Sequence, residues 1–355
     1  MAKSNCTISF FRNDLLSTGS SAGKCPVKNC SSQIDKVRFN KKSIVPFCPE
    51  HGLTIHSSGF VYYNGDSEED RIIATKRNLM FHADYYISSF FGKSKKMESG
   101  RLCNESSEDA VSYNVFTELL TNKTALKQVV KLITGRCPQD EVGLYLWGSK
   151  IDLGNNSANI YEPLEEVRKN LEKGIKGFKT EPDIMLIVPK NVVICIEAKF
   201  GSKNPLAIDK DVAEGEKPKR IEDLIERYCN KNEFINRNEI FDFESKRPRL
   251  LYEQLFRNIV FAASMAKLEG ASEWYVANLR GQHNINIKRG KPESMPVMRS
   301  VYSILKPEHK HKKRFVHLTW ENIYDNCVKG NSDLCNLAWY MKNKTLNCSR
   351  AFNIF

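Results

Sequence analysis

The most informative stretch of this 355-residue sequence reads EPDIMLIVPKNVVICIEAK and covers residues 181–199. Residues 183–188 are an acid followed by a continuous apolar run, and residues 189–191 (Pro-Lys-Asn) are typical of turns. The next run, residues 192–200, is rich in β-branched side chains. Two apolar runs joined by a short turn predict a hairpin of two central strands.

Charged side chains at the end of the second run indicate chemistry rather than packing. Because strand side chains alternate between faces, Glu197 and Lys199 point to one side and their apolar neighbours to the other. Charges on a buried strand cost free energy unless they are paired or bind a metal. Asp183 begins the partner strand, so the hairpin can bring it beside Glu197. Two adjacent carboxylates repel each other, and a divalent cation relieves that repulsion.

The spacing of these residues resembles a known signature. The EPD of residues 181–183, a spacer of thirteen residues and the EAK of residues 197–199 are similar to the motif of the PD-(D/E)XK, restriction-endonuclease-like nucleases. The resemblance covers about residues 107–326 and implies a central mixed β-sheet flanked by helices. The ESK of residues 244–246 matches part of the pattern, but it lacks apolar strands on either side.

The resemblance also implies an activity, which is Mg²⁺-dependent hydrolysis of phosphodiester bonds. Asp183 and Glu197 would hold the Mg²⁺ and the phosphate oxygen, and Lys199 would position or activate the attacking water. Some relatives carry a Gln and a Tyr four residues apart on the helix after the motif. Here Gln254 is the counterpart of the Gln, whereas Asn258 departs from the pattern and makes Gln254 a weaker candidate.

Members of the family often place a further acid on the helix before the first strand. Glu108 is the candidate, because the SEDA of residues 107–110 and the YNVF of residues 113–116 are similar to a group of bacterial proteins inferred to be restriction endonucleases. Glu118 is the competitor. On a helix these two acids point about 80° apart, and the preference for Glu108 rests on the resemblance rather than on geometry.

The rest of the chain predicts an α/β fold, because strands interleave with helices. The expected domains are a zinc-binding module at 1–65, a connecting segment at 66–105, the nuclease domain at 106–326 and a C-terminal helical tail at 327–355. Further helices are expected at 107–120, 163–173, 248–268 and from 320 onward, and further strands at 142–147, 273–279 and 315–318.

Cysteine spacing near the N-terminus predicts a structural zinc site. Cys25 and Cys30 form one pair and Cys48 and His51 a second pair, and four such ligands fill the tetrahedral coordination of Zn²⁺. His56 can replace His51, and Cys6 can also take part. The chain has 11 cysteines and no apolar signal segment at its start, so we expect metal binding in a cytoplasmic protein rather than a disulfide framework.

Charge points to a nucleic-acid partner. The net charge is 54 − 42 = +12, and the basic runs at 246–249 and 306–314 are candidate phosphate contacts. We expect double-stranded DNA as substrate and no membrane span. A homodimer is one way to cut both strands, and a restriction system would need a separate methyltransferase. The alternatives are a nuclease of the same fold that acts on branched DNA, transposon ends or RNA, and a non-catalytic zinc-containing protein that binds nucleic acid.

Overall fold

The chain forms two compact units in its computed structural model. The first unit comprises Met1–Asn122, Asp152–Ala158 and Tyr324–Phe355, and the second comprises Lys123–Ile151 and Asn159–Ile323. The structure describes residues 9–16, 24–39, 43–56, 59–63, 65, 67–90, 101–155, 158–174, 179–200, 202, 204, 227–229, 233–236, 241–242, 247–248, 252–282, 294–344, 352 and 354.

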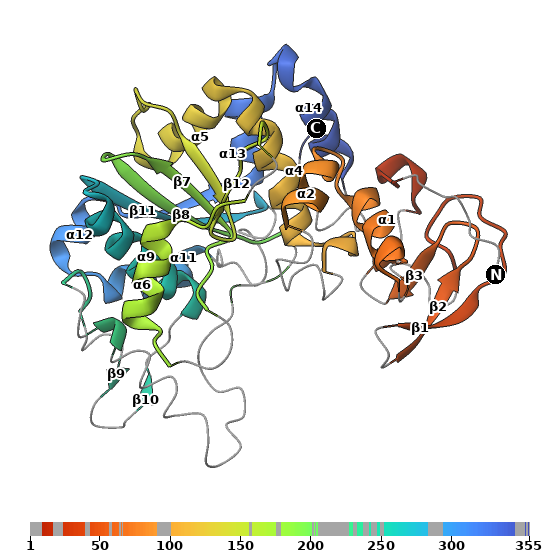
Figure 1. Cartoon of the computed structure of the whole chain (residues 1–355), viewed down its shortest axis with the longest axis horizontal. Coiled ribbons are helices and arrows are strands. Elements are labelled where there is room, and N and C mark those ends of the chain that lie inside the picture. Colours follow the sequence, from red (N-terminus) through yellow and green to blue (C-terminus); the bar gives the residue numbers. More distant parts are fainter. Residues whose placement is uncertain are drawn as a thin grey trace. The chain divides into compact units, whose positions relative to one another are not determined.

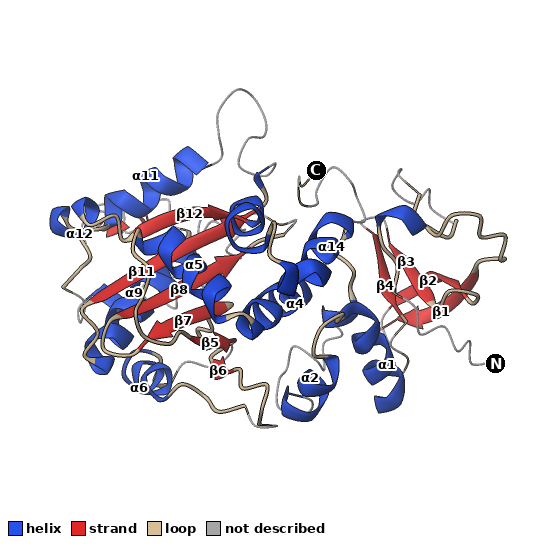
Figure 2. Ribbon diagram, turned by 90° about the horizontal axis from the view of Figure 1, so that it is seen from above, coloured by secondary structure: helices blue, strands red, loops and turns tan. Residues whose placement is uncertain are grey.

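A mixed six-stranded sheet forms the centre of the second unit. Its strands lie in the order β12-β11-β8-β7-β5-β6, as Figure 2 shows. β8 is antiparallel to β7 and parallel to β11, so it joins the antiparallel and parallel halves of the sheet. The strands are β5 (Gly143–Leu146), β6 (Ser149–Lys150), β7 (Ile184–Val188), β8 (Val192–Ala198), β11 (Glu273–Arg280) and β12 (Phe315–Thr319).

Helices cover both faces of this sheet. Figure 1 shows α9 and α6 on one side and α5 on the other. Apolar side chains of α6 and α9 form one hydrophobic core with alternate residues of β7, β8 and β11. The helices of this unit are α5 (Lys123–Thr134), α6 (Glu162–Leu171), α9 (Glu253–Glu269), α11 (Ser294–Ile304), α12 (Pro307–His311) and α13 (Trp320–Ile323), and a short ladder joins β9 (Phe241–Asp242) to β10 (Arg247–Pro248).

The predicted hairpin is confirmed. Every residue of β7 and β8 is buried, which explains why both sequences are apolar apart from Glu197. The turn closes with a bond from the Asn191 amide to the Val188 carbonyl at 3.0 Å, and Lys190 has a φ of 55°. The expected start of a helix at residue 248 is wrong, because Pro248 pairs with Phe241 in a ladder and α9 begins only at Glu253.

An antiparallel sheet and a group of helices form the first unit. The sheet has the order β1-β2-β3-β4. Its strands are β1 (Asp35–Phe39), β2 (Ser43–Cys48), β3 (Leu53–His56) and β4 (Gly59–Tyr62). The helices are α1 (Glu68–Asn78), α2 (Ala83–Phe90), α4 (Glu108–Thr121) and α14 (Cys335–Asn343), with short helical turns at Arg12–Asp14, Arg101–Cys103, Tyr324–Val328 and Ser332–Leu334.

The predicted α/β class is confirmed by these two units. The strands expected at 142–147, 273–279 and 315–318 correspond to β5, β11 and β12. The domain boundaries at residues 65, 105 and 326 stay a prediction. Within the residues that the structure describes, no helix combines the length and the apolar character needed to cross a lipid bilayer.

Candidate active site and metal cluster

Asp183 lies immediately before β7, and it is bonded to residues at the ends of β8 and β5. Its carboxylate Oδ2 accepts a hydrogen bond from the Ala198 amide of β8 at 3.0 Å. Its backbone carbonyl accepts from the Trp147 amide at 3.2 Å, at the end of β5. Since Ala198 stands between Glu197 and Lys199, the hairpin brings Asp183 to the part of β8 that carries the other two residues of the motif.

Glu197 and Lys199 form a buried ion pair. Their exposed fractions are 2% and 5%, and Nζ of Lys199 lies 2.6 Å from Oε1 of Glu197. The backbone of Lys199 is held on both sides, because its amide donates to the Leu279 carbonyl at 2.8 Å and its carbonyl accepts from Trp320 Nε1 at 3.1 Å. Burial excludes an ordinary solvated Glu–Lys pair, since removing two charges from water carries a desolvation penalty.

Asn258, which the sequence marked only as a departure from the Gln–Tyr pattern, contacts Glu197 directly. Its Nδ2 donates to Oε2 of Glu197 at 3.0 Å, and its side chain is buried in α9. Gln254 lies one turn earlier on the same helix and is only partly buried. The departure from the Gln–Tyr pattern therefore marks the helix residue that contacts the acid. The four-residue spacing from Gln254 was the signal available, because residues four apart share one face of a helix.

A row of polar side chains continues from Glu197 across the sheet. The register places Asn278 of β11 next to Glu197 and His317 of β12 next to Asn278. Nδ2 of Asn278 lies 3.2 Å from Nδ1 of His317. Oδ1 of Asn278 accepts a hydrogen bond from Nδ2 of Asn204 at 3.1 Å. A single Asn within the mostly apolar run at residues 274–279 was a weak sequence signal for this polar extension of the site.

The segment that leads into Asp183 is clamped by α6 and the residue that follows it. Arg168 donates from Nε and Nη2 to the Thr180 carbonyl at 2.9 and 2.6 Å. The Glu172 carboxylate accepts from the Thr180 amide at 3.0 and 3.1 Å, from the Thr180 hydroxyl, and from the Tyr228 hydroxyl at 2.8 Å. Both backbone groups of Thr180 are thus fixed three residues before Asp183, which restricts where that carboxylate can lie.

The two candidate helix acids belong to the first unit, whereas Asp183, Glu197 and Lys199 belong to the second. Glu108 lies in the first turn of α4, which Ser107 caps by accepting from the Ala110 amide at 3.2 Å. Glu118 instead pairs with Nε2 of His82 at 3.1 Å. The choice of Glu108 stays a prediction.

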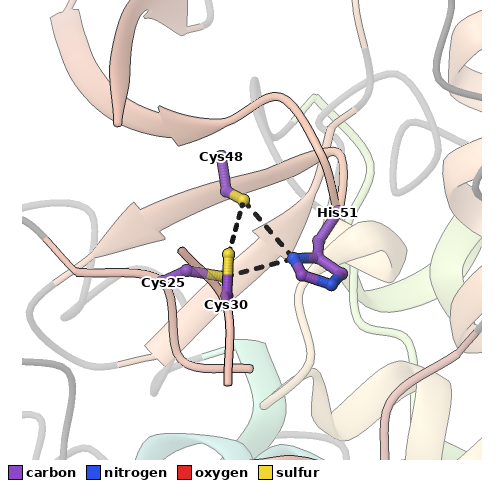
Figure 3. A group of neighbouring side chains, drawn as sticks. All are labelled: Cys25, Cys30, Cys48 and His51. Atoms are coloured by element: carbon purple, nitrogen blue, oxygen red, sulfur yellow. Dashed lines mark hydrogen bonds between the residues drawn. The ribbon is translucent and has the colours of Figure 1, made fainter. Parts of the chain in front are cut away.

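The four residues predicted as zinc ligands converge in the first unit. One ligand atom from each of Cys25, Cys30, Cys48 and His51 lies within 4.8 Å of all the others. Figure 3 shows the three thiols and the ring pointing toward one another. Nδ1 of His51 lies 3.6 Å from Cys25 Sγ and 3.5 Å from Cys48 Sγ. Three sulfurs and one imidazole nitrogen are a donor set that suits tetrahedral Zn²⁺.

The local fold explains this convergence. Cys48 ends β2, and a tight turn presents His51 before β3 begins. Burial raises the pKa of the Cys25 and Cys30 thiols, so a metal must displace protons when it binds. Among the described residues, the group that could hold a metal contains His51 and not His56. Cys6 lies outside the described residues.

One comparison with known proteins gives a match. A family model described as "Restriction Endonuclease associating with ARP" matches residues 54–343, which is more than half of the chain. No curated protein and no solved structure matches this chain. The matched segment contains Asp183, Glu197 and Lys199, and it includes parts of both units. The chain therefore belongs to the family of restriction endonucleases associating with ARP.

Proposed function

We propose that the protein is a metal-dependent DNA endonuclease of the PD-(D/E)XK kind, with a restriction-endonuclease-like fold in its second unit, acting in restriction or phage defence. The observation that carries the proposal is the grouping of Asp183 with the buried Glu197–Lys199 pair where the adjacent strands β7 and β8 meet. Family membership supports a nuclease role and DNA as substrate. The net charge of +12 suits a polyanionic partner.

The site residues divide the work of hydrolysis between them. In the reaction a water oxygen forms a bond to phosphorus and one phosphorus–oxygen ester bond breaks. The water gives up a proton to solvent, and the leaving oxygen takes one up to become a hydroxyl. The carboxylates of Asp183 and Glu197 would hold Mg²⁺, which lowers the pKa of bound water and offsets developing negative charge. Lys199 positions the water and stabilises charge on the phosphate, and Asn258 keeps the Glu197 carboxylate in place.

The further parts of the proposal follow from the chemistry of double-strand cleavage. One active site cuts one strand, so a homodimer or two successive binding events would cut both. If the protein serves in restriction, protection of host DNA falls to a separate methyltransferase. Glu108 is proposed as the additional acid and Gln254 as an accessory residue near the substrate.

Replacement of Glu197 by glutamine is expected to lower the rate of plasmid cleavage in Mg²⁺ by about 10²–10³-fold, equivalent to about 3–4 kcal/mol of barrier. The amide keeps the size of the side chain but loses the charge that would hold the metal. Glu244→Gln is the matched control, because Glu244 stands in the same acid-x-Lys pattern outside the hairpin.

Gel analysis of nicked and linear plasmid measures both variants against wild type, with EDTA as a second control. Unchanged cleavage by folded Glu197→Gln would remove this residue from the site. If wild type cuts no duplex, the same panel with branched DNA and RNA decides between the same-fold alternatives. If wild type binds nucleic acid but cuts none of these substrates, the proposed nuclease is wrong and the protein is a nucleic-acid-binding protein.

We also propose that the Cys25, Cys30, Cys48 and His51 cluster holds a structural Zn²⁺. Four protein ligands fill the coordination sphere and leave no position for substrate, which distinguishes a structural from a catalytic zinc.

Cys48→Ser is expected to abolish stoichiometric zinc in the purified protein, because a hydroxyl is a poor replacement for a thiolate. The measurement is elemental analysis by mass spectrometry, with about one zinc per chain expected in wild type. Cys137→Ser is the control, since that cysteine is exposed and outside the cluster. Equal zinc in the Cys48 and Cys137 variants would refute the assignment.

A further inference from the structure

The turn that carries His51 is held by an arginine from outside the cluster. Arg77 lies in the last turn of α1, and only 5% of it is exposed. It donates from Nη2 to the His51 carbonyl at 2.9 Å and from Nη1 to the Gly52 carbonyl at 3.1 Å. Gly52 has a φ of 57°, which glycine adopts readily in a tight turn. One side chain therefore fixes two successive carbonyls of the turn that presents the nitrogen ligand.

Aromatic rings surround this buried cation and the ligand together. The Arg77 guanidinium lies 4.5 Å from the centre of the Tyr62 ring and 5.8 Å from that of Phe10. The Phe10 ring also meets the His51 ring edge-on, with centroids 5.4 Å apart. Attraction between the cation and the rings offsets part of the cost of burying Arg77. Phe10 thus packs against both Arg77 and His51.

The residue after Arg77 connects the same helix to the C-terminal part of the unit. Asn78 accepts through Oδ1 from Nζ of Lys344 at 2.8 Å. Nζ of Lys344 also pairs with Oε2 of Glu105 at 2.5 Å, and that oxygen accepts from the Tyr62 hydroxyl at 3.4 Å. Two adjacent residues at the end of α1 therefore contact the metal-binding turn and the buried lysine respectively.

We propose that Arg77 is a positioning residue for the metal cluster, and that the end of α1 couples metal binding to the packing of Lys344. The inference rests on the proposed metal site. A turn held by Arg77 presents Nδ1 of His51 in its ligating position before metal arrives. Without Arg77, metal binding must also order the turn, and the affinity falls. Coupling of this kind is reciprocal, so metal also stabilises the end of α1.

Zinc affinity of the full-length protein tests the role of Arg77, measured by competition with a chromophoric chelator. Arg77→Met is expected to weaken zinc binding by about 10–100-fold, the usual effect of losing a group that orients a ligand. Arg77→Lys is expected to weaken it as well, because one ammonium group lacks the planar fork that bridges two carbonyls. Arg71→Met is the control, because it removes an arginine from the same helix away from the turn.

Hydrogen exchange of wild type, with and without chelator, tests the coupling without any substitution. Zinc removal is expected to speed exchange at the end of α1 and around Lys344, while β11 in the second unit serves as the internal reference. Wild type that takes up no zinc would overturn the metal site and this inference with it. If wild type binds zinc and both Arg77 variants bind it with an affinity within twofold of wild type, the positioning role alone is overturned. Unchanged exchange in α1 would overturn the coupling.

Discussion

Replacement of Lys199 by methionine is expected to reduce DNA cleavage by about 10²–10³-fold, the usual effect of removing one group that stabilises developing charge in an active site. In the absence of Mg²⁺ it is also expected to lower the free energy of unfolding by about 3–5 kcal/mol, the usual effect of breaking a buried ion pair. Methionine keeps much of the length and volume of the side chain, so packing changes little. What changes is that the Glu197 carboxylate, 2% exposed, loses its cation while its hydrogen bond from Asn258 remains.

Mg²⁺ is expected to restore part of the stability of this variant but not its activity. A divalent cation held by Asp183 and Glu197 would supply the missing positive charge, so the folded variant should gain more from Mg²⁺ than the folded wild type does. Urea unfolding with and without saturating Mg²⁺ measures how much Mg²⁺ stabilises the variant and how much it stabilises wild type. Equal stabilisation of wild type and variant would show that the metal does not bind beside Glu197.

An exposed pair supplies the control for this experiment. Lys123→Met breaks a surface ion pair with Glu141 on the same unit, and exposed pairs contribute little to stability. It is expected to leave cleavage and the response to Mg²⁺ unchanged. Normal cleavage by folded Lys199→Met would remove the lysine from the chemistry, whatever its effect on stability.

The hairpin and the proximity of Asp183, Glu197 and Lys199 could be predicted because their signal is local. Alternation within β8 determines the face of Glu197 and Lys199, and the short turn determines that Asp183 lies beside them. The convergence of Cys25, Cys30, Cys48 and His51 was predictable for a similar reason, since cysteines five residues apart and a Cys–His pair three apart are ligand spacings.

The parts that escaped prediction depend on contacts between distant segments. Asn258 is 61 residues from Glu197 in the chain, and Arg77 is 26 residues from His51. Helical spacing from Gln254 gives the face of α9 on which Asn258 lies, but it does not show which charge on another element that face meets. The return of Tyr324–Phe355 to the first unit is of the same kind, because it rests on contacts such as that of Lys344 with Glu105 rather than on any pattern within the segment.

That contact leads to the second large effect. Replacement of Lys344 by methionine is expected to destabilise the first unit by about 3–5 kcal/mol, because it leaves a buried carboxylate without its counter-charge. Glu105 and Lys344 are 1% and 3% exposed, and Nζ lies 2.5 Å from Oε2. Urea titration followed by hydrogen-exchange mass spectrometry of α1 and α14 measures the loss in this unit specifically.

The double variant Glu105→Gln/Lys344→Met separates the charge from the packing. Removing both charges also removes the desolvation penalty of each, so the double variant is expected to be more stable than Lys344→Met alone. A double variant that is no more stable than the single one would mean that the lysine acts through its contact with Asn78 rather than through the carboxylate.

Lys344→Met is expected to lose free energy of unfolding relative to wild type, and the pH dependence of this loss gives an independent check on its cause. Burial raises the pKa of Glu105, and the attraction of Lys344 opposes that rise. Without the lysine, the pKa of Glu105 in the folded protein rises further. A carboxyl whose pKa is higher when folded stabilises the fold below its unfolded value, about 4.5, and loses that contribution as pH rises through the folded value. The deficit relative to wild type should therefore be small near pH 4.5 and grow toward neutral pH, because only the ionised carboxylate needs the cation that was removed.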